Sequence, residues 1–246
     1  MNRLLGFLFL CFIIPLAGQG QNKVEYSADF VFNDGLYITF EDFKNNNPIP
    51  ITHILSDYDI RDPEYLNIIV SQDSVVYYDN LFEERSIAVK DLWGYCKRNK
   101  VFIAFGEEST YNNPSFFDFY PLVNIGAFSF FTAVESYYRT MSAGTNMGMG
   151  MGATGMGYRD PMMNNDLTVT ESEQVQLLLQ FSTGKILLGK RGNLGNLPVD
   201  LVSRLIKSDQ QLSSEFESLS LRDQKLKGMF YLRRYNQRNP ISFPVY

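Results

Sequence analysis

Two adjacent pairs of carboxylates are the residues best suited to acid–base chemistry in this chain of 246 residues: Glu41 with Asp42, and Glu83 with Glu84. Glycoside hydrolysis needs two carboxyl groups that flank the scissile bond, one acting as an acid and the other as a base or nucleophile. Adjacent acidic residues are also common on protein surfaces, and a sequence does not give the distance between two carboxylates. These pairs keep a carbohydrate- or peptide-active enzyme open as an alternative, and we assign no catalytic residue.

The other reactive side chains fit structural roles better. His53 is the only histidine and lies in an apolar stretch, which rules out a zinc site built from several histidines. Nothing in the sequence pairs Cys96 with His53, so we expect this cysteine to behave as a small buried hydrophobic residue. Residues 57–62 resemble a calcium-binding loop superficially, but Arg61 occupies the fifth position and the sixth is not glycine. We expect a solvated acidic turn there.

A methionine- and glycine-rich segment, residues 141–166, differs from the rest of the chain. Seven of the nine methionines lie between Met141 and Met163, several of them in Met-Gly repeats. Because glycine loses much conformational freedom on folding, we expect a flexible, low-complexity insertion between two strands. A tolerated surface loop and an adaptable contact surface are two interpretations. Thioether sulfur is also a soft ligand, so Cu(I) binding by Met147, Met149 and Met151 is a third. We expect no other metal and no cofactor.

The first twenty residues have the pattern of a secretory signal peptide. Arg3 precedes an apolar run over residues 4–16, and the small residues Ala17, Gly18 and Gly20 follow it. The run is too short for a convincing transmembrane helix, which needs about 20 apolar residues. Cys11 lies inside the run and follows Leu10, an arrangement that does not suit lipid attachment. We therefore expect a periplasmic or secreted protein that is not lipid-anchored and is cleaved after Gly18 or Gly20.

Composition indicates one globular domain after removal of the signal peptide. The chain is 45% hydrophobic and carries a net charge of −5. We expect a single domain over residues 21–240, with a β-rich body at 21–195, a helical segment at 196–238 and a tail at 239–246. Residues 221–246 hold six basic side chains against one acidic, a balance of +5, which leaves −10 for the remainder. This basic end suits packing on the acidic body, exposure to solvent, or an anionic partner such as a lipid headgroup or polysaccharide.

Runs of β-branched and aromatic residues predict a strand-rich body. Short polar turns at 97–100 and 182–184 predict two hairpins, and Gly126 marks a bulge or a close approach of backbone. The fold class we expect is α+β, mainly antiparallel β-sheet in a sandwich or an open roll, followed by a C-terminal helical segment. The predicted strands cover residues 35–40, 66–70, 74–78, 86–95, 101–105, 116–119, 123–138, 175–181 and 185–188.

Three helices are predicted after residue 195. Asn196 can cap the first helix, which has Pro198 in its first turn and places Leu201, Val202, Leu205 and Ile206 on one face. The next helix begins at a capping box formed by Ser208 and Gln211. The last helix begins near Ser220, buries Leu226, Met229 and Phe230, and ends before Pro240.

Three separated blocks of the chain are similar to those of a family of uncharacterised exported proteins of the Bacteroidota. The blocks are residues 36–48, which read LYITFEDFKNNNP, residues 91–96, which read DLWGYC, and residues 235–240, which read YNQRNP. The resemblance spans nearly the whole processed chain, although the Met-Gly segment departs from it. It implies an envelope or secreted location and brings no activity, cofactor or catalytic residue. In a structural interpretation, Gly35 and Gly94 occupy tight backbone positions and Trp93 fills the core.

These observations favour a non-enzymatic exported envelope protein that binds a partner or a surface. The partner is an unknown envelope protein or a polysaccharide, and no nucleic acid is expected for an exported acidic protein. We expect no transmembrane segment in the processed chain. The carboxylate-dependent enzyme remains the main alternative, and Cu(I) binding by the Met-rich segment is a minor one.

Overall fold

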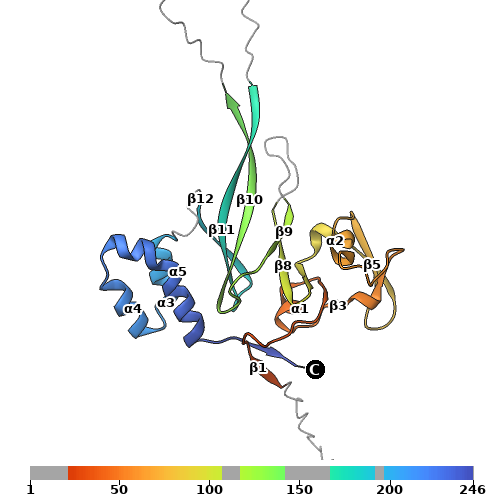
Figure 1. The fold of residues 1–246 in the computed structure, drawn as a ribbon, viewed down its shortest axis with the longest axis horizontal. Helices are drawn as coiled ribbons and strands as arrows, with labels where there is room; N and C mark the ends of the chain where they lie inside the picture. The colour runs from red at the N-terminus through yellow and green to blue at the C-terminus, as the bar shows by residue number, and fades with distance from the viewer. Residues whose placement is uncertain (1–21, 107–116, 142–166, 192–196, 246) are drawn as a thin grey trace, which may run out of the picture.

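The chain has an α+β fold in which antiparallel sheets are followed by C-terminal helices, as the sequence predicts (Figure 1). The structure is a computed structural model, and it describes residues 22–106, 117–141, 167–191 and 197–245. Within these ranges, thirteen strands form four antiparallel sheets. The central part holds two of the sheets, with a helical lobe on one side and a smaller α/β lobe on the other (Figure 1).

The first central sheet has five strands in the order β3-β2-β7-β8-β9. The predicted hairpin is present, because β7 and β8 are joined by Arg98 and Asn99, whose φ angles of 51° and 60° are those of a type I′ turn. Gly35 and Gly94 do occupy tight positions, since a Cβ atom on either would lie within about 2.2 Å of a carbonyl oxygen on the neighbouring strand. The strands are β2 (Gly35–Tyr37), β3 (Ile49–Pro50), β7 (Gly94–Lys97), β8 (Lys100–Phe105) and β9 (Asp118–Pro121).

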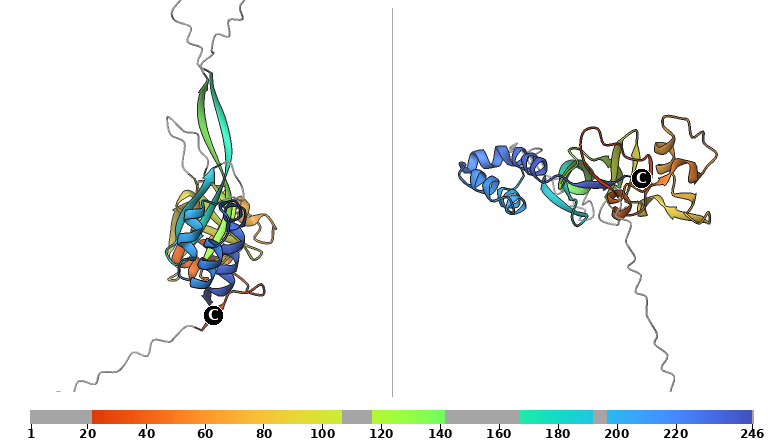
Figure 2. Two further views of the ribbon diagram at one scale, coloured as in Figure 1. Left: turned by 90° about the vertical axis from the view of Figure 1, so that its left-hand side faces the viewer. Right: turned by 90° about the horizontal axis from the view of Figure 1, so that it is seen from below.

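The second central sheet is built on a long hairpin. Strands β10 (Phe128–Met141) and β11 (Leu167–Gln180) pair along their whole length, and β12 (Lys185–Arg191) adds to β11. The predicted turn after β11 is confirmed, with Gly184 at a φ of 69°. The far ends of β10 and β11 project well beyond the other elements (Figures 1 and 2). The base of the hairpin thus contributes to the hydrophobic core, whereas its far end extends away from the other elements.

The two central sheets pack against each other across the main hydrophobic core. The core takes Tyr37, Cys96 and Ile103 from the five-stranded sheet, and Phe131, Leu177 and Leu179 from the three-stranded one. Trp93 packs on this core as expected, with its ring stacked 4.6 Å from that of Phe43. The arrangement is sandwich-like, and it accounts for the many aromatic residues of the sequence.

The smaller lobe corrects two predicted strands. Residues 66–70 form helix α2 (Tyr65–Val70), because Tyr65, Leu66 and Ile69 lie on one helical face and are buried together. Residues 86–95 do not form one strand, since β6 ends at Ala88 and a 3-10 turn, Val89–Asp91, leads to β7 in another sheet. The lobe's own sheet consists of β4 (Ile54–Leu55), β5 (Ser74–Tyr78) and β6 (Glu84–Ala88), and 3-10 turn Ile51–His53 precedes it.

The three predicted C-terminal helices are present and pack together on the three-stranded sheet. They are α3 (Val199–Ile206), α4 (Gln210–Glu217) and α5 (Leu221–Arg238). Helix α5 begins next to Ser220 as expected, and Ser220 is its N-cap. Asp209 rather than Ser208 caps α4, and Pro198 holds the N-cap position of α3. Asn196, the expected cap of α3, lies outside the described residues.

The buried face of α5 also differs from the predicted one. Leu226 and Phe230 are exposed, whereas Gly228, Tyr231 and Leu232 are buried against the other helices and the sheet. Met229, also expected to be buried, is half-buried against the core. The correction arises because the helix has apolar residues on two sides, and the sequence does not say which side meets the sheet.

Residues 242–244 belong to the domain and do not form a free tail. Strand β13 (Ser242–Pro244) pairs with β1 (Lys23–Glu25) in a two-stranded sheet. Phe243 is fully buried, with ring neighbours that include Phe30, Phe32 and Phe181. Helix α1 (Phe40–Lys44), which begins with a Thr39–Asp42 capping box, packs on the same cluster. The predicted boundary at residue 239 is therefore too early.

Candidate functional site

Three of the four carboxylates that the sequence offered as pairs make local hydrogen bonds or ion pairs, and the fourth is exposed. Asp42 forms the capping box of α1 with Thr39, and Glu41 lies 3.5 Å from Lys44 on the exposed side of the same helix. Glu83 pairs with Arg85 beyond the end of β5, and Glu84 is exposed at the start of β6. None of these four carboxylates lines either of the two cavities described next.

Cys96 and His53 also lie in structural settings, as expected. Cys96 is fully buried, and its Sγ atom is 3.5 Å from a carboxylate oxygen of Asp34. Burial and the nearby Asp34 raise the pKa of this thiol, so Cys96 remains protonated and unreactive. The Nδ1 atom of half-buried His53 is 3.3 Å from the carbonyl oxygen of Tyr78.

The acidic stretch 57–62 is an exposed turn. Asp59 accepts a hydrogen bond from the amide of Arg61, and Asp62 accepts one from the amide of Glu64. Each carboxylate therefore stabilises its own turn. Across the ranges that the structure describes, no three His, Cys, Asp or Glu side chains come together as metal ligands would. Met147, Met149 and Met151 of the suggested Cu(I) site lie outside those ranges.

A cavity that combines charged and aromatic side chains opens between α2 and one face of the five-stranded sheet. We call it the charged cavity, and its volume is about 510 Å³. Helix α2 and the residue before it supply one wall, and strands β7, β8 and β9 supply the other. The lining residues are Glu64, Asn67, Val70, Ser71, Tyr95, Lys97, Arg98, Lys100, Phe102, Asp118 and Phe119.

A chain of hydrogen bonds connects the two walls of the charged cavity. The Tyr95 hydroxyl donates to Oδ1 of Asn67 at 3.1 Å, and the Asn67 amide nitrogen donates to the Glu64 carboxylate. Glu64 also accepts from the Nζ atom of Lys97 at 2.9 Å. Four side chains, from α2, the residue before it and β7, are thus connected by hydrogen bonds, and such connections favour the preorganisation that a binding site needs.

Aromatic rings form the apolar part of the charged cavity. The ring of Tyr95 is stacked on that of Phe102, with centroids 4.7 Å apart and an interplanar angle of 6°. Phe119 meets Tyr95 edge-on at 5.2 Å. Tyr95 is buried, whereas Phe102 and Phe119 are half-exposed. The two phenylalanines therefore present an apolar surface beside the hydrogen-bonding groups.

Neighbouring charged groups and burial shift the pKa values of two side chains that line the charged cavity, Glu64 and Tyr95. The hydrogen bond from Lys97 holds the pKa of the Glu64 carboxyl below its usual range, against a smaller opposing effect of burial. Burial raises the pKa of Tyr95 to about 12, and the carboxylates of Asp118 and Glu64 add to that increase. Near neutral pH, Glu64 is consequently an anion that accepts hydrogen bonds, and Tyr95 is a neutral hydroxyl that donates one.

Two further cations stand at the rim of the charged cavity. Arg98 and Lys100 are exposed in and after the β7–β8 turn. The turn is fixed by Asp34, whose carboxylate accepts hydrogen bonds from the backbone amides of Arg98 at 3.0 Å and Asn99 at 3.4 Å. The cavity thus has three cations and two carboxylates, a balance of +1.

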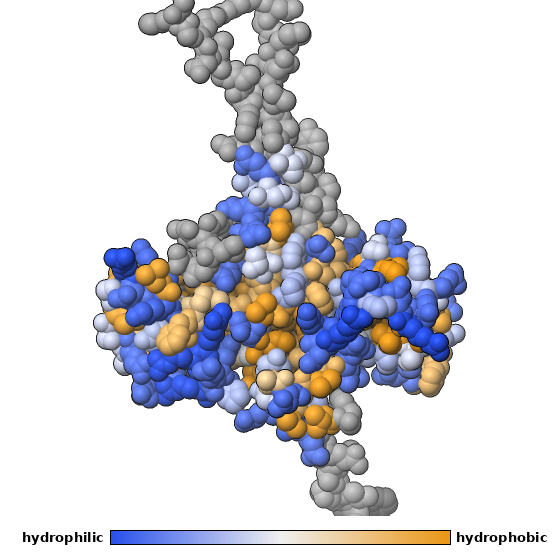
Figure 3. Space-filling model, viewed as in Figure 1, coloured by the Kyte–Doolittle hydropathy of each residue, from blue (hydrophilic) through white to orange (hydrophobic). Residues whose placement is uncertain are grey.

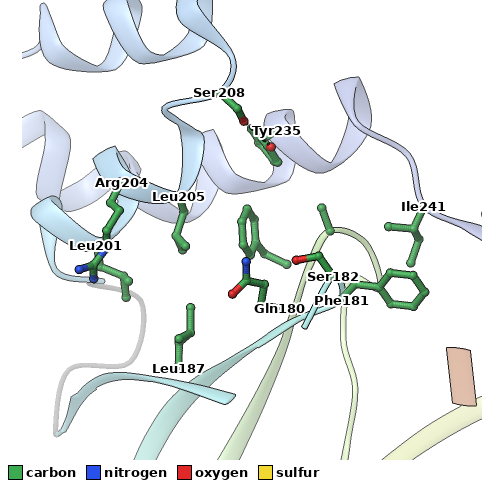
Figure 4. A pocket seen from close by; sticks show the side chains of 12 residues that line it. Gln180, Phe181, Ser182, Leu187, Leu201, Arg204, Leu205, Ser208, Tyr235 and Ile241 are labelled. Carbon is green, nitrogen blue, oxygen red and sulfur yellow. Dashed lines mark hydrogen bonds between the residues drawn. The ribbon is translucent and has the colours of Figure 1, made fainter. Parts of the chain in front are cut away.

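A second cavity, the seam cavity, lies between the three-stranded sheet and the C-terminal helices, and its volume is about 630 Å³ (Figure 4). Phe181 on one side belongs to the main core. Leu201 on the other side belongs to a second cluster, the helical core, in which α3, α4 and α5 pack together on the three-stranded sheet. Across the upper edge in Figure 4, the Ser208 and Tyr235 hydroxyls are hydrogen-bonded at 2.7 Å. The lining residues are Ala127, Phe128, Gln180, Phe181, Ser182, Leu187, Leu201, Arg204, Leu205, Ser208, Tyr235 and Ile241.

The two cavities offer different chemistry. The lining of the seam cavity is mainly apolar, and Arg204 is its only charged side chain. The charged cavity combines a fixed hydrogen-bond chain, carboxylates with defined ionisation and an aromatic surface. Shifted pKa values beside a pocket are typical of functional sites, so the charged cavity is the better candidate.

Sequence reasoning missed the charged cavity for a definite reason. Residues 66–70 were expected to form a strand, whose alternating side chains would not have placed Glu64 and Asn67 toward the same partner. In helix α2 the spacing of three residues puts both on one side, and Lys97 and Tyr95 project from β7 to meet them. The polar spacing Glu64–Asn67 was the available signal.

No protein-family model matches this chain, and no curated protein or solved structure matches it either. None of the described helices has both the length and the apolar character needed to cross a bilayer.

Proposed function

We propose that this chain is a non-enzymatic, exported envelope protein that binds a polysaccharide in the charged cavity. The single observation that carries the proposal is the hydrogen-bond chain from Tyr95 through Asn67 and Glu64 to Lys97, set beside the half-exposed rings of Phe102 and Phe119. A sugar has an apolar face that packs on aromatic rings and hydroxyl groups that pair with carboxylates and amides. The cavity provides both kinds of partner.

The charge of the cavity favours an acidic polysaccharide. Lys97 is neutralised by Glu64, but Arg98 and Lys100 make no ion pair with another described residue. Cations at a rim attract an anionic chain before contact and contribute to its orientation. The ionisation of Glu64 and Tyr95 also suits binding, because neither group is poised to exchange a proton near neutral pH.

The cellular setting in this proposal rests on the sequence. The signal-peptide pattern of residues 1–20 supports export, and the three blocks that resemble exported proteins of the Bacteroidota support an envelope or secreted location. Polysaccharides are abundant in such a location. Mass spectrometry of the exported chain should show an N-terminus at Gln19 or Gln21, and an intact Met1 would contradict this setting.

The proposal is tested by measuring binding with two defined glycans. Affinity electrophoresis with polygalacturonate, an acidic polysaccharide, should retard the protein more strongly than dextran, which is neutral. Asn67→Ala and Lys97→Gln should each weaken retardation by about tenfold, because each breaks the hydrogen-bond chain beside a charged group. Lys44→Gln is the matched control, since Lys44 also pairs with a glutamate but lies on α1, outside the cavity.

Two results would contradict polysaccharide binding. One is the absence of retardation by either glycan, and the other is equal retardation of the cavity variants and the wild type. A third result would instead assign the cavity to a protein partner. In this result the wild type recovers one envelope protein from extracts and the Lys97→Gln variant does not recover it.

One observation favours the enzymatic alternative as a second candidate. Glu64 and Asp118 both line the charged cavity, and both act electrostatically on the hydroxyl of Tyr95. Because Glu64 is held ionised, it would be the nucleophile and Asp118 would have to be the acid. Release of reducing ends from polygalacturonate, abolished in both Glu64→Gln and Asp118→Asn, would support hydrolysis. Retardation without such release supports binding alone.

A further inference from the structure

We propose that the exposed face of α5 docks on an anionic phospholipid bilayer. This inference is independent of the charged cavity, because α5 belongs to the helical lobe on the other side of the central sheets (Figures 1 and 2). The face contains Arg222, Lys225, Leu226, Phe230 and Arg233.

The geometry of α5 places four of these residues along one side of the helix, with Lys225 exposed beside them. Arg222, Leu226, Phe230 and Arg233 follow one another at intervals of three or four residues, the spacing of neighbours on a helix surface. Leu226 is 61% exposed and Phe230 is 56% exposed, although both are large apolar side chains. Tyr231 and Leu232 anchor the opposite side in the helical core. The helix therefore has a buried apolar face and a second apolar stripe that faces solvent.

Most of the charges around this stripe are basic, and the one acidic side chain in α5, Asp223, is hydrogen-bonded to the N-cap residue Ser220. Arg222, Lys225, Lys227 and Arg233 make no ion pair within the described part of the chain, whereas Arg234 pairs with Glu215 and Arg238 pairs with Asp209. Figure 3 shows the helical lobe as mostly hydrophilic surface, with smaller hydrophobic areas between the polar side chains. A helix with cations around exposed leucine and phenylalanine suits the interface of an anionic membrane.

The charges around α5 favour an anionic bilayer as its binding partner. A second exposed apolar site of the chain, which has acidic neighbours, provides the comparison. Leu81 and Phe82, between β5 and β6, are 76% and 74% exposed, more than the two residues of α5. Their neighbours Asp79, Glu83 and Glu84 are acidic, with Arg85 as the nearby cation. An anionic surface would repel that loop and attract α5. Exposure alone would not distinguish the two sites, but their charges do.

The test is sedimentation with vesicles, using the chain that begins at Gln21 so that the apolar leader does not bind lipid itself. Wild-type protein should sediment with vesicles of phosphatidylglycerol and phosphatidylcholine, and remain in solution with phosphatidylcholine alone. Binding should weaken as salt is raised. Circular dichroism of each variant confirms that the helices are retained.

Three variants separate the contributions. The triple variant Arg222→Gln, Lys225→Gln, Arg233→Gln should lower the vesicle partition coefficient by about a hundredfold, since each cation near the surface contributes about fivefold. Leu226→Ser with Phe230→Ser should lower it by about tenfold, because the apolar insertion is lost. The matched control Leu81→Ser with Phe82→Ser should bind as the wild type does.

Several outcomes would overturn the inference. They are absence of sedimentation with anionic vesicles, equal binding to neutral vesicles, or an unchanged partition coefficient of the triple variant. Loss of polygalacturonate retardation in the triple variant, without any vesicle binding by the wild type, would assign the face to a polysaccharide and also contradict bilayer docking.

Discussion

Asn236 in α5 makes both backbone hydrogen bonds of Phe128 at the start of β10, although the two residues are 108 positions apart. Its Oδ1 atom accepts from the Phe128 amide at 2.9 Å, and its Nδ2 atom donates to the Phe128 carbonyl at 2.8 Å. The side chain thus replaces a neighbouring strand at that position. Gly126 makes room for it, because a Cβ atom there would lie 2.6 Å from Cγ of Asn236.

Asn236→Ala should destabilise the protein by about 1–3 kcal/mol, because it leaves the amide and carbonyl of Phe128 without their partner. Urea unfolding monitored by tryptophan fluorescence measures the change. Gln237→Ala is the matched control, since Gln237 is the next residue and is exposed. Equal unfolding midpoints of the two variants would show that the Asn236–Phe128 contact adds nothing to stability.

Phe243→Ala should cost about 3–5 kcal/mol, the usual range for removal of a fully buried phenylalanine. Phe243 packs among rings from the N-terminal segment, α1 and β11–β12, so the cavity would weaken several elements together. Thermal unfolding by calorimetry provides the measurement. Val245→Ala is the control, because it shortens a partly exposed side chain two residues further on. Its unfolding midpoint should change little. A small effect of Phe243→Ala would mean that residues 242–244 are not part of the core.

The Glu64–Lys97 pair should give a pH-dependent contribution to stability. The pKa of Glu64 is lower in the folded chain than in the unfolded one, so its contribution is complete above the unfolded value, about 4.3, and is lost as pH falls through the folded pKa. Glu64→Gln should therefore have a slightly lower melting temperature than the wild type at pH 7. The difference should disappear toward pH 3, and a difference that grows on acidification would contradict the assignment. The effect is small because Glu64 is exposed.

The parts of the fold that local sequence determines were predicted well. The hairpin at 97–100 needs only a polar two-residue turn between apolar runs. The predicted start of α5 near Ser220 depends on a side chain that binds an amide three residues away. The same holds for the turn at Gly184. Each of these features depends on interactions within a few residues, which a sequence displays directly.

The parts that depend on distant contacts were not predicted. Residues 66–70 are rich in β-branched side chains, yet burial of Tyr65, Leu66 and Ile69 on one face makes them a helix. Phe230 was expected inside and lies outside, because the sheet meets the other side of α5. The charged cavity was missed for the same reason, since it forms only when α2 packs beside β7.

The pairing of β1 with β13 also determines when folding can finish. Residues 23–25 leave the ribosome, and any export channel, long before residues 242–244 do. Until those last residues are synthesised, Phe30, Phe32 and Phe43 of α1 lack the Phe243 ring that contacts all three of them. The aromatic core of the nascent chain therefore stays incomplete at one end until synthesis of the last strand is finished.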